Sequence, residues 1–429
     1  MKKSIVRTLV ALFCIGLPTL VSAQTTREDI HANLLKTGGN YYAYPDVRHP
    51  LTAAPKGYKP FYISHYARHG SRWLIDPGQY NRPVNVLTKA REQGKLSATG
   101  EKVLQVCDSV AKMAQGRYGE LSPRGARQHR HIAQRMYENF PQVFAKNAPV
   151  DARSTVIIRC ILSMMNECLQ LQACEPTIQL KTDASAHDMY YMNNENQPDI
   201  QKYRNNPDIH EAHKQLNANR TKEKDIAPRL FNDLQYANDS IDAGGLISDL
   251  FAVASNMQSL DTDLDLYWLF SEQEAYDLWA NYNMGWHINY SNSPLTKGKM
   301  PFLEADLLRN ILDTADSCIT QKKPGATLRF GHEVVVLPLA SLMELGHYGQ
   351  EFQDDATLEE HWRNYEVFPM ACNIQLVFYR KAKSADILVK ILLNEQEMTL
   401  PIKSDLAPYY HWTDVATFYR NKLAHFTTE

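Results

Sequence analysis

Apolar and polar positions vary along the first half of the chain in a way that predicts strands and helices in turn. Residues 59–66, KPFYISHY, have the period of two that is typical of a half-buried β-strand. Residues 97–115 and 122–144 instead have apolar positions at helical spacing, and each stretch begins at a serine that can cap a helix. Residues 149–171 change from a short strand pattern into a long apolar helix.

The middle of the chain differs in composition from the first part, and strand patterns return only after it. Residues 181–300 are rich in Asn, Tyr, Asp and Gln and contain few strand signals, which predicts a mainly helical insertion. A helix is expected over residues 305–319, followed by a β-strand over residues 326–332. Residues 373–381 and 386–400 then alternate or run apolar around a turn, which predicts two further strands.

This order of elements predicts an α/β fold with a central, mostly parallel sheet flanked by helices and an inserted, mainly helical cap domain. The expected boundaries are residues 24–180 and 301–429 for the core and residues 181–300 for the cap. A chain of 429 residues that is 44% hydrophobic is long enough for a large core and a second lobe.

The first 23 residues are typical of a signal peptide rather than of the folded protein. MKKSIVR is a short basic region, TLVALFCIGLPTL is an apolar run, and VSA supplies the small residues of a cleavage site after Ala23. The apolar run is too short to span a membrane, and no other segment is a candidate for a spanning helix. We therefore expect an exported protein, periplasmic or extracellular, with no membrane span.

The charge of the mature chain argues against nucleic acid as a partner. Removal of residues 1–23 takes away Lys2, Lys3 and Arg7 and no acid, so 46 basic and 48 acidic residues become 43 and 48, a net charge of −5. A slightly acidic protein is not suited to bulk binding of nucleic acid. A strongly anionic ligand would instead need a local cluster of positive charge.

Six cysteines follow the cleavage site, and an oxidising compartment permits disulfides between them. Cys168 and Cys174 are the nearest candidates for a local pair, whereas free buried thiols are the alternative. The sequence does not determine the pairing, and no cysteine spacing is typical of a zinc site.

Two segments rich in basic residues each follow a predicted strand and precede a helix. The first, YARHGSRW at residues 66–73, places Arg68, His69 and Arg72 within five positions. The second is RFGHE at residues 329–333. Since ligands of open α/β sheets bind at the carboxyl ends of the strands, we expect both segments at the same edge of the sheet. Helix N-termini at that edge add partial positive charge, which favours phosphate.

The residue types near these segments match the needs of phosphoryl transfer. Three arginines can spread positive charge over phosphate oxygens and so do the work that a metal does elsewhere. A neutral histidine can attack phosphorus and form a phosphohistidine. A carboxylic acid can protonate the leaving alcohol and then act as a base toward water. The candidate residues are Arg68, His69, Arg72, Arg159, His332 and Glu333.

The segment RHGSRW at residues 68–73 resembles the R-H-G-x-R signature of the branch 2 histidine phosphatases, the histidine acid phosphatases. GELSPRGARQHRHIAQRM, residues 119–136, is similar to the L-T-x-x-G helix of that family, with Ser122 in place of threonine. RCILS, residues 159–163, resembles the stretch that has the third phosphate-binding arginine. LFSEQEAYDLWANYNMGWHINYSNSP, RFGHEVVVLPLASLMEL and ILLNEQEMTLP look most like the multiple inositol polyphosphate phosphatases. The similarity covers nearly all of the mature chain and is weakest over residues 185–250.

The resemblance implies a phosphomonoester hydrolase that works through a phosphohistidine, with His69 as the nucleophile and an acid near His332 as the proton donor. The residues that it assigns to phosphate binding are Arg68, Arg72, Arg159 and His332. One departure concerns the acid. Multiple inositol polyphosphate phosphatases have H-A-E and related phytases have H-D, whereas this chain reads His332-Glu333-Val334. We expect Glu333 to be the donor, and the alternative is that it only caps the following helix.

Our preferred substrate is an inositol polyphosphate such as phytate, and we expect neither a metal nor another cofactor. The alternatives among enzymes are a broad acid phosphatase for sugar phosphates or nucleotides and a phosphotransferase that acts on an acceptor alcohol. A protein that only binds a phosphorylated ligand is disfavoured, because a nucleophile, three arginines and an acid are all present. His65 is expected to be structural or to lie behind the site, and His129 and His131, on a polar helix, are expected in solvent.

Overall fold

The structure is a computed structural model. It describes residues 25–193, 197–218, 220, 223–322, 324–353 and 357–428. The expected signal peptide over residues 1–23 lies outside the described residues. Within the described ranges, no helix is long and apolar enough to cross a membrane.

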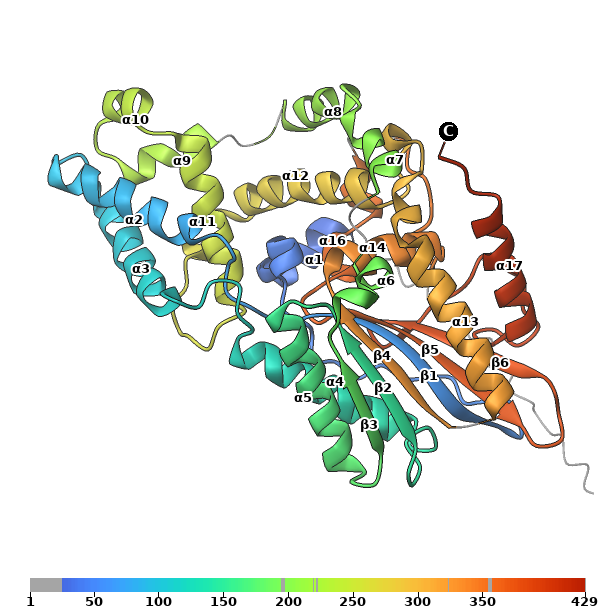
Figure 1. Ribbon diagram of the computed structural model, residues 1–429. Coiled ribbons are helices and arrows are strands. Elements are labelled where there is room, and N and C mark those ends of the chain that lie inside the picture. Colours follow the sequence, from blue (N-terminus) through green and yellow to red (C-terminus); the bar gives the residue numbers. More distant parts are fainter. Residues whose placement is uncertain are drawn as a thin grey trace, which may run out of the picture.

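In the described part of the chain, an eight-stranded mixed sheet forms the centre of the core (Figure 1). The strands are β1 (Tyr58–Arg68), β2 (Pro149–Ser154), β3 (Gln179–Asp183), β4 (Gly325–Gly331), β5 (Asn373–Lys381), β6 (Ile387–Leu393), β7 (Gln396–Glu397) and β8 (Tyr410–His411). Their order is β3-β2-β4-β1-β5-β6-β7, and β8 pairs with β6. The first four neighbours are parallel, whereas β5 is antiparallel to both β1 and β6. β1 to β4 and β6 therefore run in one direction, which confirms the predicted mostly parallel sheet.

Helices pack on both faces of the sheet. They are α4 (Pro123–Asn139), α5 (Ile158–Cys174), α13 (Ala305–Gln321), α14 (Glu333–Leu342) and α17 (Trp412–Ala424). α4 and α5 share one hydrophobic core with the strands, and α13, α14 and α17 share another on the opposite face. The helix predicted over residues 122–144 ends at Asn139, because Pro141 disfavours the helical conformation of the residue before it.

β1 lies in the middle of the sheet and is buried on both faces over most of its length, whereas its alternating pattern predicted a half-buried strand. Tyr62 and Tyr66 belong to the core that contains α13 and α14, while Ile63 and Ala67 belong to the core that contains α4 and α5. Since side chains of a strand alternate between the faces, His65 points to the same side as Ile63 and Ala67. The polar positions of β1 are therefore interior positions.

Most of the predicted insertion consists of helices. They are α6 (Met189–Met192), α7 (Pro198–Gln201), α8 (Asp208–Asn217), α9 (Glu223–Leu230), α10 (Leu234–Ser240), α11 (Ala243–Met257) and α12 (Glu272–Tyr290). α9 and α11 pack against α2 (Pro77–Glu92) and α3 (Ala98–Ala114), which precede the insertion in the sequence. The group of helices on the left of Figure 1 is thus built from two separate stretches of chain. The domain boundaries themselves stay a prediction.

Local signals fix the start of the helices that support the site. The side chain of Ser122 accepts a hydrogen bond from the N–H of Gly125, and Pro123 occupies the first helical position of α4, as the sequence predicts. The side chain of Ser97 caps α3 in the same way. Both caps satisfy backbone donors that have no partner within the helix, so each helix begins at a defined residue.

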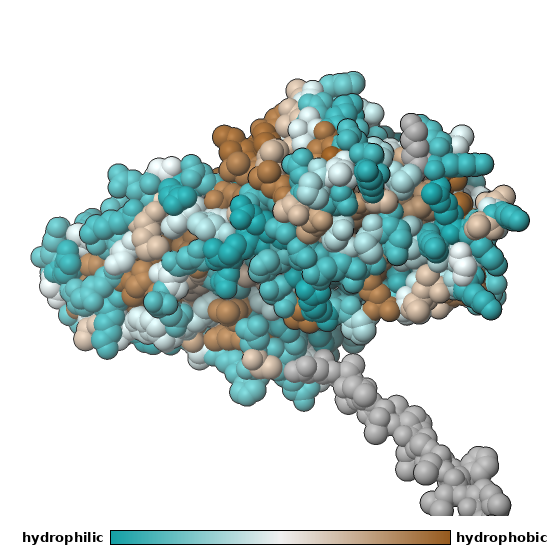
Figure 2. All heavy atoms as spheres, turned by 90° about the horizontal axis from the view of Figure 1, so that it is seen from below, coloured by the Kyte–Doolittle hydropathy of each residue, from teal (hydrophilic) through white to brown (hydrophobic). Residues whose placement is uncertain are grey.

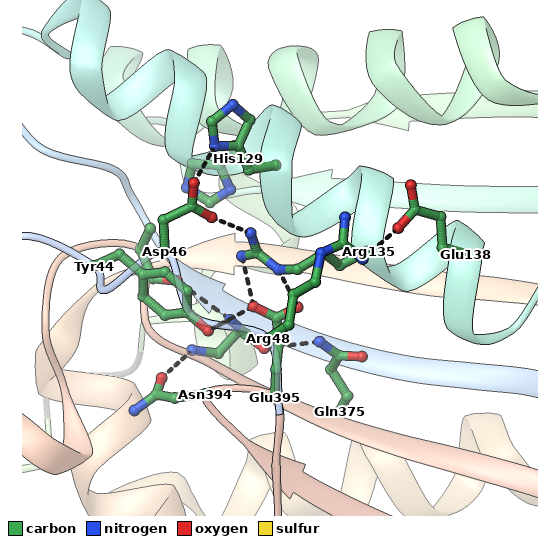
Figure 3. Close-up of polar contacts among 12 residues, drawn as sticks. Tyr44, Asp46, Arg48, His129, Arg135, Glu138, Gln375, Asn394 and Glu395 are labelled. Atoms are coloured by element: carbon green, nitrogen blue, oxygen red, sulfur yellow. Dashed lines mark hydrogen bonds and ion pairs between the residues drawn. The ribbon is translucent and has the colours of Figure 1, made fainter. Parts of the chain in front are cut away.

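Arg135 of α4 ties the helix to the turn after β6 (Figure 3). Its Nε and Nη2 donate to the two carboxylate oxygens of Glu395 at 2.9 and 2.7 Å, and its Nη1 contacts Asp46. Tyr44 Oη donates to Glu395 at 3.0 Å. This buried pair has good geometry and additional hydrogen bonds, so it holds α4 in a fixed position relative to the sheet.

Apolar side chains lie mostly in the interior. Viewed from below, the surface is mainly hydrophilic, with apolar side chains gathered in separate patches (Figure 2). On α5, Ile158, Leu162 and Leu169 are exposed, while Met164 and Leu171 are buried against the sheet. The long apolar pattern of residues 149–171 therefore corresponds to a helix that is apolar on its inner face and on much of its outer face.

All six cysteines that follow the expected cleavage site are among the described residues, and each is a free thiol. The local pair of Cys168 and Cys174 is not formed. Both residues lie on α5, and a separation of six residues places them on different sides of a helix. Cys168 is buried with the sheet and Cys174 is half-buried near the end of α5, so the alternative of free thiols holds.

Candidate active site

The carboxyl ends of β1 and β4 bring the two predicted motifs to one edge of the sheet. Arg68, the last residue of β1, pairs with Gly331, the last residue of β4. The N–H of His69 donates to the carbonyl of Gly331 at 2.9 Å. His332 is the N-cap residue of α14, and Glu333 is the first residue of that helix. Parallel pairing therefore places Arg68 and His69 beside His332 and Glu333, as expected.

His69 is fully buried and is held as a neutral imidazole. Its Nδ1 lies 2.9 Å from the carbonyl oxygen of Gly70, and a carbonyl only accepts, so Nδ1 has the proton. Nε2 then has the lone pair, and it makes no hydrogen bond to any described residue. Burial, followed by the charges of Arg68 and Arg159, holds the pKa of His69 well below its usual value of 6.5. The histidine is in the form that a nucleophile requires.

Arg68 is anchored by backbone carbonyls and by the acid. Nη1 donates to the carbonyls of Asn40 at 2.7 Å and Phe368 at 2.9 Å, and Nε lies 3.0 Å from Glu333 Oε2. Burial lowers the pKa of Arg68, and the charge of Glu333 opposes this effect. Nη2 is buried and has no hydrogen-bond partner in the described part of the chain. The guanidinium is thus fixed in place with one nitrogen available to a bound anion.

Arg72 and Arg159 supply further unpaired donors. Arg72 is buried in the loop after β1, with its guanidinium 5.6 Å from the centre of the Tyr41 ring, and Nη1 donates to the carbonyl of Trp73. Arg159 lies in the first turn of α5 and is half-buried. Burial and the charge of Arg72 lower its pKa. The Nε atoms of both side chains lack hydrogen-bond partners among the residues that the structure describes, which leaves them available to an anion.

His332 stands next to His69, with 5.6 Å between the ring centres. Its Nε2 lies 3.4 Å from Thr155 Oγ1 and 3.6 Å from the Sγ atom of Cys160. Burial lowers the pKa of His332 to about 4, although Glu333 opposes the change. His332 is therefore neutral at mildly acidic pH and can donate a hydrogen bond to a phosphate oxygen.

Glu333 is the one acid of the candidate set, and it is ionised in the protein without substrate. Its Oε2 lies 3.0 Å from Arg68 Nε and 3.8 Å from His69 Nε2. Burial opposes ionisation, but the charges of Arg68 and Arg72 outweigh it and bring the pKa of Glu333 to about 2. The carboxylate therefore lies beside Nε2 of His69 and next to the guanidinium of Arg68.

Two glycines allow the loop after β1 to approach α4. A Cβ atom on Gly70 would lie 2.4 Å from the carbonyl oxygen of Gly125, and one on Gly125 would lie 2.2 Å from the carbonyl oxygen of Ser71. Only hydrogen atoms fit at both positions. Ser122 closes the contact, because its backbone N–H donates to the same carbonyl of Ser71 at 2.9 Å. The glycine of R-H-G-x-R and the glycine of the L-T-x-x-G helix are thus two sides of one contact.

Sequence reasoning missed the side chains that hold this loop. Gln128 accepts a hydrogen bond from the N–H of Ser71 at 2.8 Å and donates to its hydroxyl at 3.0 Å. Ser163 Oγ accepts from the N–H of Gly70 at 3.1 Å. The only signal for them was position, since Gln128 is one helical turn after Gly125 and Ser163 is one turn after Arg159.

The prediction that His129 lies in solvent is wrong. Its side chain is fully buried, and Nδ1 lies 2.9 Å from Glu167 Oε2. The reason is that α4 turns Gly125, His129 and Ile132 toward the sheet, so this polar helix has polar residues on its inner face. His131 is exposed and lies 3.1 Å from Asp46, as expected of a surface residue.

His69, His332 and Glu333 offer ligand atoms that lie within 4.8 Å of one another, a spacing that can suit a metal ion. The same cluster borders Arg68 and Arg72, and after burial the charges of these arginines lower the pKa values of both histidines. Permanent positive charge at this range opposes a divalent cation and attracts an anion. The donor set is therefore better suited to phosphate than to a metal.

Comparison with solved structures finds proteins with the same fold. A complex of the multiple inositol polyphosphate phosphatase of Bifidobacterium longum with inositol hexasulfate is 18% identical over 90% of this chain and 97% of that one, with a TM-score of 0.73. The phytase of D. castellii is 12% identical over 92% and 86%, with a TM-score of 0.69. The phytase of Hafnia alvei is 12% identical over 86% and 98%, with a TM-score of 0.52. Comparison with curated proteins finds no match.

A family comparison gives a more specific result. Residues 47–394 match the histidine phosphatase superfamily, branch 2. The matched range begins before β1 and ends just after β6, so it contains both strand ends and the first turns of α5 and α14, where the arginines, histidines and acid of the site lie. On this match over most of its length, the chain belongs to branch 2 of the histidine phosphatase superfamily.

Proposed function

We propose that this phosphatase hydrolyses phosphomonoesters by transferring the phosphoryl group first to His69 and then to water. The observation that carries the proposal is the state of His69. Its hydrogen bond to the carbonyl of Gly70 leaves a lone pair on Nε2, and its pKa is held low by burial and by Arg68 and Arg159. A neutral imidazole among three arginines combines a nucleophile with the charge needed to bind its electrophile.

In the first step, Arg68, Arg72 and Arg159 bind the non-bridging oxygens of the phosphate. His69 Nε2 forms a bond to phosphorus as the ester P–O bond breaks, and the leaving oxygen takes a proton from Glu333. The alcohol departs and leaves a phosphohistidine beside a carboxylate.

In the second step, water loses a proton to the carboxylate of Glu333 and attacks phosphorus. The N–P bond breaks, its electron pair returns to Nε2 of His69, and inorganic phosphate is released. The histidine and the protonated acid are regenerated, so no other reactant is required.

The charge state of Glu333 sets a condition on this cycle. In the protein without substrate the pKa of Glu333 is about 2, so the donor lacks its proton at working pH. A bound phosphate places negative charge between the arginines and the carboxyl, which raises the carboxyl pKa. We propose that phosphate replaces Glu333 as the partner of Arg68, and that the freed carboxyl takes up the proton that it later donates.

For the substrate, we propose an inositol polyphosphate such as phytate. The support comes from the solved structures with this fold, which are described as a multiple inositol polyphosphate phosphatase and as phytases. The first of these was solved with inositol hexasulfate, an analogue in which sulfates stand in for phosphates. A polyanion of this kind gains attraction from a local cluster of arginines even on a protein that is slightly acidic as a whole.

One observation favours the alternative, a broad acid phosphatase. A cavity of about 300 Å³ is lined in part by Asn40, whose carbonyl accepts from Arg68, and by Tyr41, whose ring lies 5.6 Å from the Arg72 guanidinium. Among the described residues that line it, none is charged, and the aromatic ones are Tyr41, Phe251, Trp279, Tyr282 and Trp286. Further phosphates of an inositol ring would find no cation here, whereas a flat, uncharged leaving group such as a nucleoside fits.

The test is phosphate release from phytate, a nucleoside monophosphate and a small aryl phosphate, measured for the wild type, His69→Ala and the surface control His131→Ala. We expect turnover by the wild type and the control and none by His69→Ala. Preference for phytate supports the first substrate class, and preference for the nucleotide supports the second. Formation of a new ester with added glycerol would show a phosphotransferase, and tight binding without turnover would contradict the enzyme.

We further propose export, on the pattern of residues 1–23 alone. Expression of the full chain in a Gram-negative host tests this proposal, because the mature protein should be recovered outside the cytoplasm with Gln24 as its first residue. Recovery of the uncleaved chain in the cytoplasm would contradict it.

A further inference from the structure

A second cluster of titratable side chains lies behind the active site. His65, His129 and Glu167 are all fully buried. His129 Nδ1 lies 2.9 Å from Glu167 Oε2, and His65 Nδ1 lies 3.6 Å from Glu167 Oε1. Both imidazoles pack against the ring of Phe330, with centres 5.6 and 5.7 Å away. The chemistry proposed above uses none of these groups.

Each member of the cluster belongs to an element that positions part of the site. His65 is on β1, three residues before Arg68. His129 is on α4, directly after Gln128, which binds Ser71. Glu167 is on α5, one turn after Ser163, which binds the N–H of Gly70 and is itself one turn after Arg159. Phe330, which both imidazoles contact, is on β4, directly before the last strand residue Gly331 and two residues before His332. The cluster thus joins four of the elements that contribute to the site.

The loop after β1, which contains His69, is held mostly through its backbone by side chains from two different helices. Gln128 of α4 and Ser122, the N-cap residue of that helix, bind Ser71, while Ser163 of α5 binds Gly70. The loop is therefore bound at Ser71 by α4 and at Gly70 by α5. The packing of α4 against α5 sets the distance between these two contacts, and hence the orientation of the adjacent His69. The hydrogen bond from His129 to Glu167 joins the same two helices. His129 directly follows Gln128 on α4, and Glu167 is one turn after Ser163 on α5.

We propose that Glu167, with His129 and His65, positions the His69 loop relative to Arg159 and His332. This inference rests on the function proposed above. It also explains a costly arrangement, because both nitrogens of His65, Nε2 of His129 and Oε1 of Glu167 are buried without hydrogen-bond partners in the described ranges. Buried polar groups in this state are destabilising, and apolar residues of the same size would pack without that cost.

Two substitutions of Glu167 separate positioning from simple packing. Glu167→Leu keeps the volume but removes the acceptor, and Glu167→Gln keeps an acceptor oxygen for His129. We expect Glu167→Leu to lower kcat and the rate of His69 phosphorylation by about tenfold to a hundredfold, the cost of a misplaced reacting group. We expect KM and the inhibition constant of inorganic phosphate to change by less than about threefold, since the arginines remain. Glu167→Gln should recover most of the rate.

His287 offers a matched control, because it is also a fully buried histidine with no hydrogen bond at either ring nitrogen in the described residues, and it packs against Trp362 at 5.1 Å. His287→Phe should shift Tm and leave kcat unchanged. Normal kcat per folded molecule in Glu167→Leu would overturn the proposal, as would equal losses in Glu167→Leu and Glu167→Gln. Loss of activity in His69→Ala alongside normal Glu167→Leu would show that only the positioning proposal fails.

A measurement on the wild type covers the case in which Glu167→Leu does not fold. With ¹⁵N-labelled histidine, addition of inorganic phosphate should move the ring signals of His129 and His65, since the loop and the cluster are one unit, and should leave the signal of His287 in place. Unmoved signals of His129 and His65 at saturating phosphate would overturn the proposal.

Discussion

Replacement of Glu333 by glutamine tests the least familiar feature of the site, the acid that directly follows His332. Glutamine keeps the size of the side chain but removes both its charge and its ability to donate a proton as a carboxylic acid. In the structure the carboxylate lies 3.0 Å from Arg68 Nε and 3.8 Å from His69 Nε2. The change therefore tests two proposed roles of the same carboxylate. One is to donate a proton to the leaving oxygen, and the other is to occupy the place at Arg68 that phosphate would take.

The structure sets the expected magnitudes. With a pKa of about 2, Glu333 is protonated in only about one free molecule in 1,000 at pH 5, so the donor must gain its proton in the substrate complex. General acid catalysis contributes about 10²- to 10⁴-fold, and Glu333→Gln should slow esters of poorly leaving alcohols such as inositol phosphates by that factor. Activated aryl phosphates leave without a proton and should slow by less than about tenfold. Inorganic phosphate should bind more tightly, because Arg68 loses its internal partner.

The assay is steady-state hydrolysis of both ester types across pH, with Glu138→Gln, a surface carboxylate on α4, as the control. A required acid is lost as pH rises through its pKa in the complex, so kcat of the wild type should fall on the alkaline side. That fall should disappear in Glu333→Gln with inositol phosphates. If both ester types slow by the same factor, or neither slows, the donor lies elsewhere and Glu333 only caps α14.

The remaining predictions concern the nucleophile, the charges, the substrate and the loop. His69→Ala should abolish turnover and the phosphohistidine that acid quenching traps in the wild type. Because the pKa of His69 lies well below 6.5, wild-type activity should persist at mildly acidic pH and fall only as the pH drops through that pKa. EDTA should leave the rate unchanged, whereas Arg159→Ala should cost about a hundredfold, and a need for added divalent cation would contradict this. KM for phytate should rise with salt more than KM for a singly phosphorylated ester, and equal sensitivity would favour the broad acid phosphatase. Gly125→Ala should reduce kcat by about tenfold or more, because its Cβ would lie 2.2 Å from the carbonyl of Ser71 and displace the loop. A normal kcat would contradict this, because it would show that the loop can move without misplacing His69.

The sequence predicted the elements that local signals specify. Strand patterns located β1 and β4, and a capping serine located the start of α4. The candidate site followed from the place of both motifs at strand ends, because parallel strands bring their carboxyl ends together. The sequence did not reveal α2, whose pattern is interrupted by Pro83, or β3, whose five residues are mostly exposed at the edge of the sheet. These elements are defined by contacts with distant parts of the chain, and local periodicity does not report such contacts.

The burial of polar side chains shows the same limit in the site itself. His129 was expected in solvent because its neighbours are polar, yet packing of α4 on the sheet buries it. Gln128 and Ser163 had no chemical signature, because their work is to bind backbone N–H groups of the loop. The sequence therefore identifies the candidate groups for reaction and phosphate binding, while the groups that hold the loop after β1 emerge only when the helices are placed.

The position of Glu333 has a consequence for how the site works. As the first residue of α14 it directly follows the N-cap His332, whereas the acid of an H-A-E motif is one residue further on, about 100° around the helix axis. At this position a glutamate side chain reaches Arg68, and its carboxylate partly neutralises a buried cluster of arginines in the absence of substrate. In the proposed cycle, bound phosphate takes over that role with more charge and more acceptor oxygens. Substrate binding and protonation of Glu333 would then be one event, because the phosphate that replaces the carboxylate at Arg68 removes the charge contact that keeps Glu333 ionised.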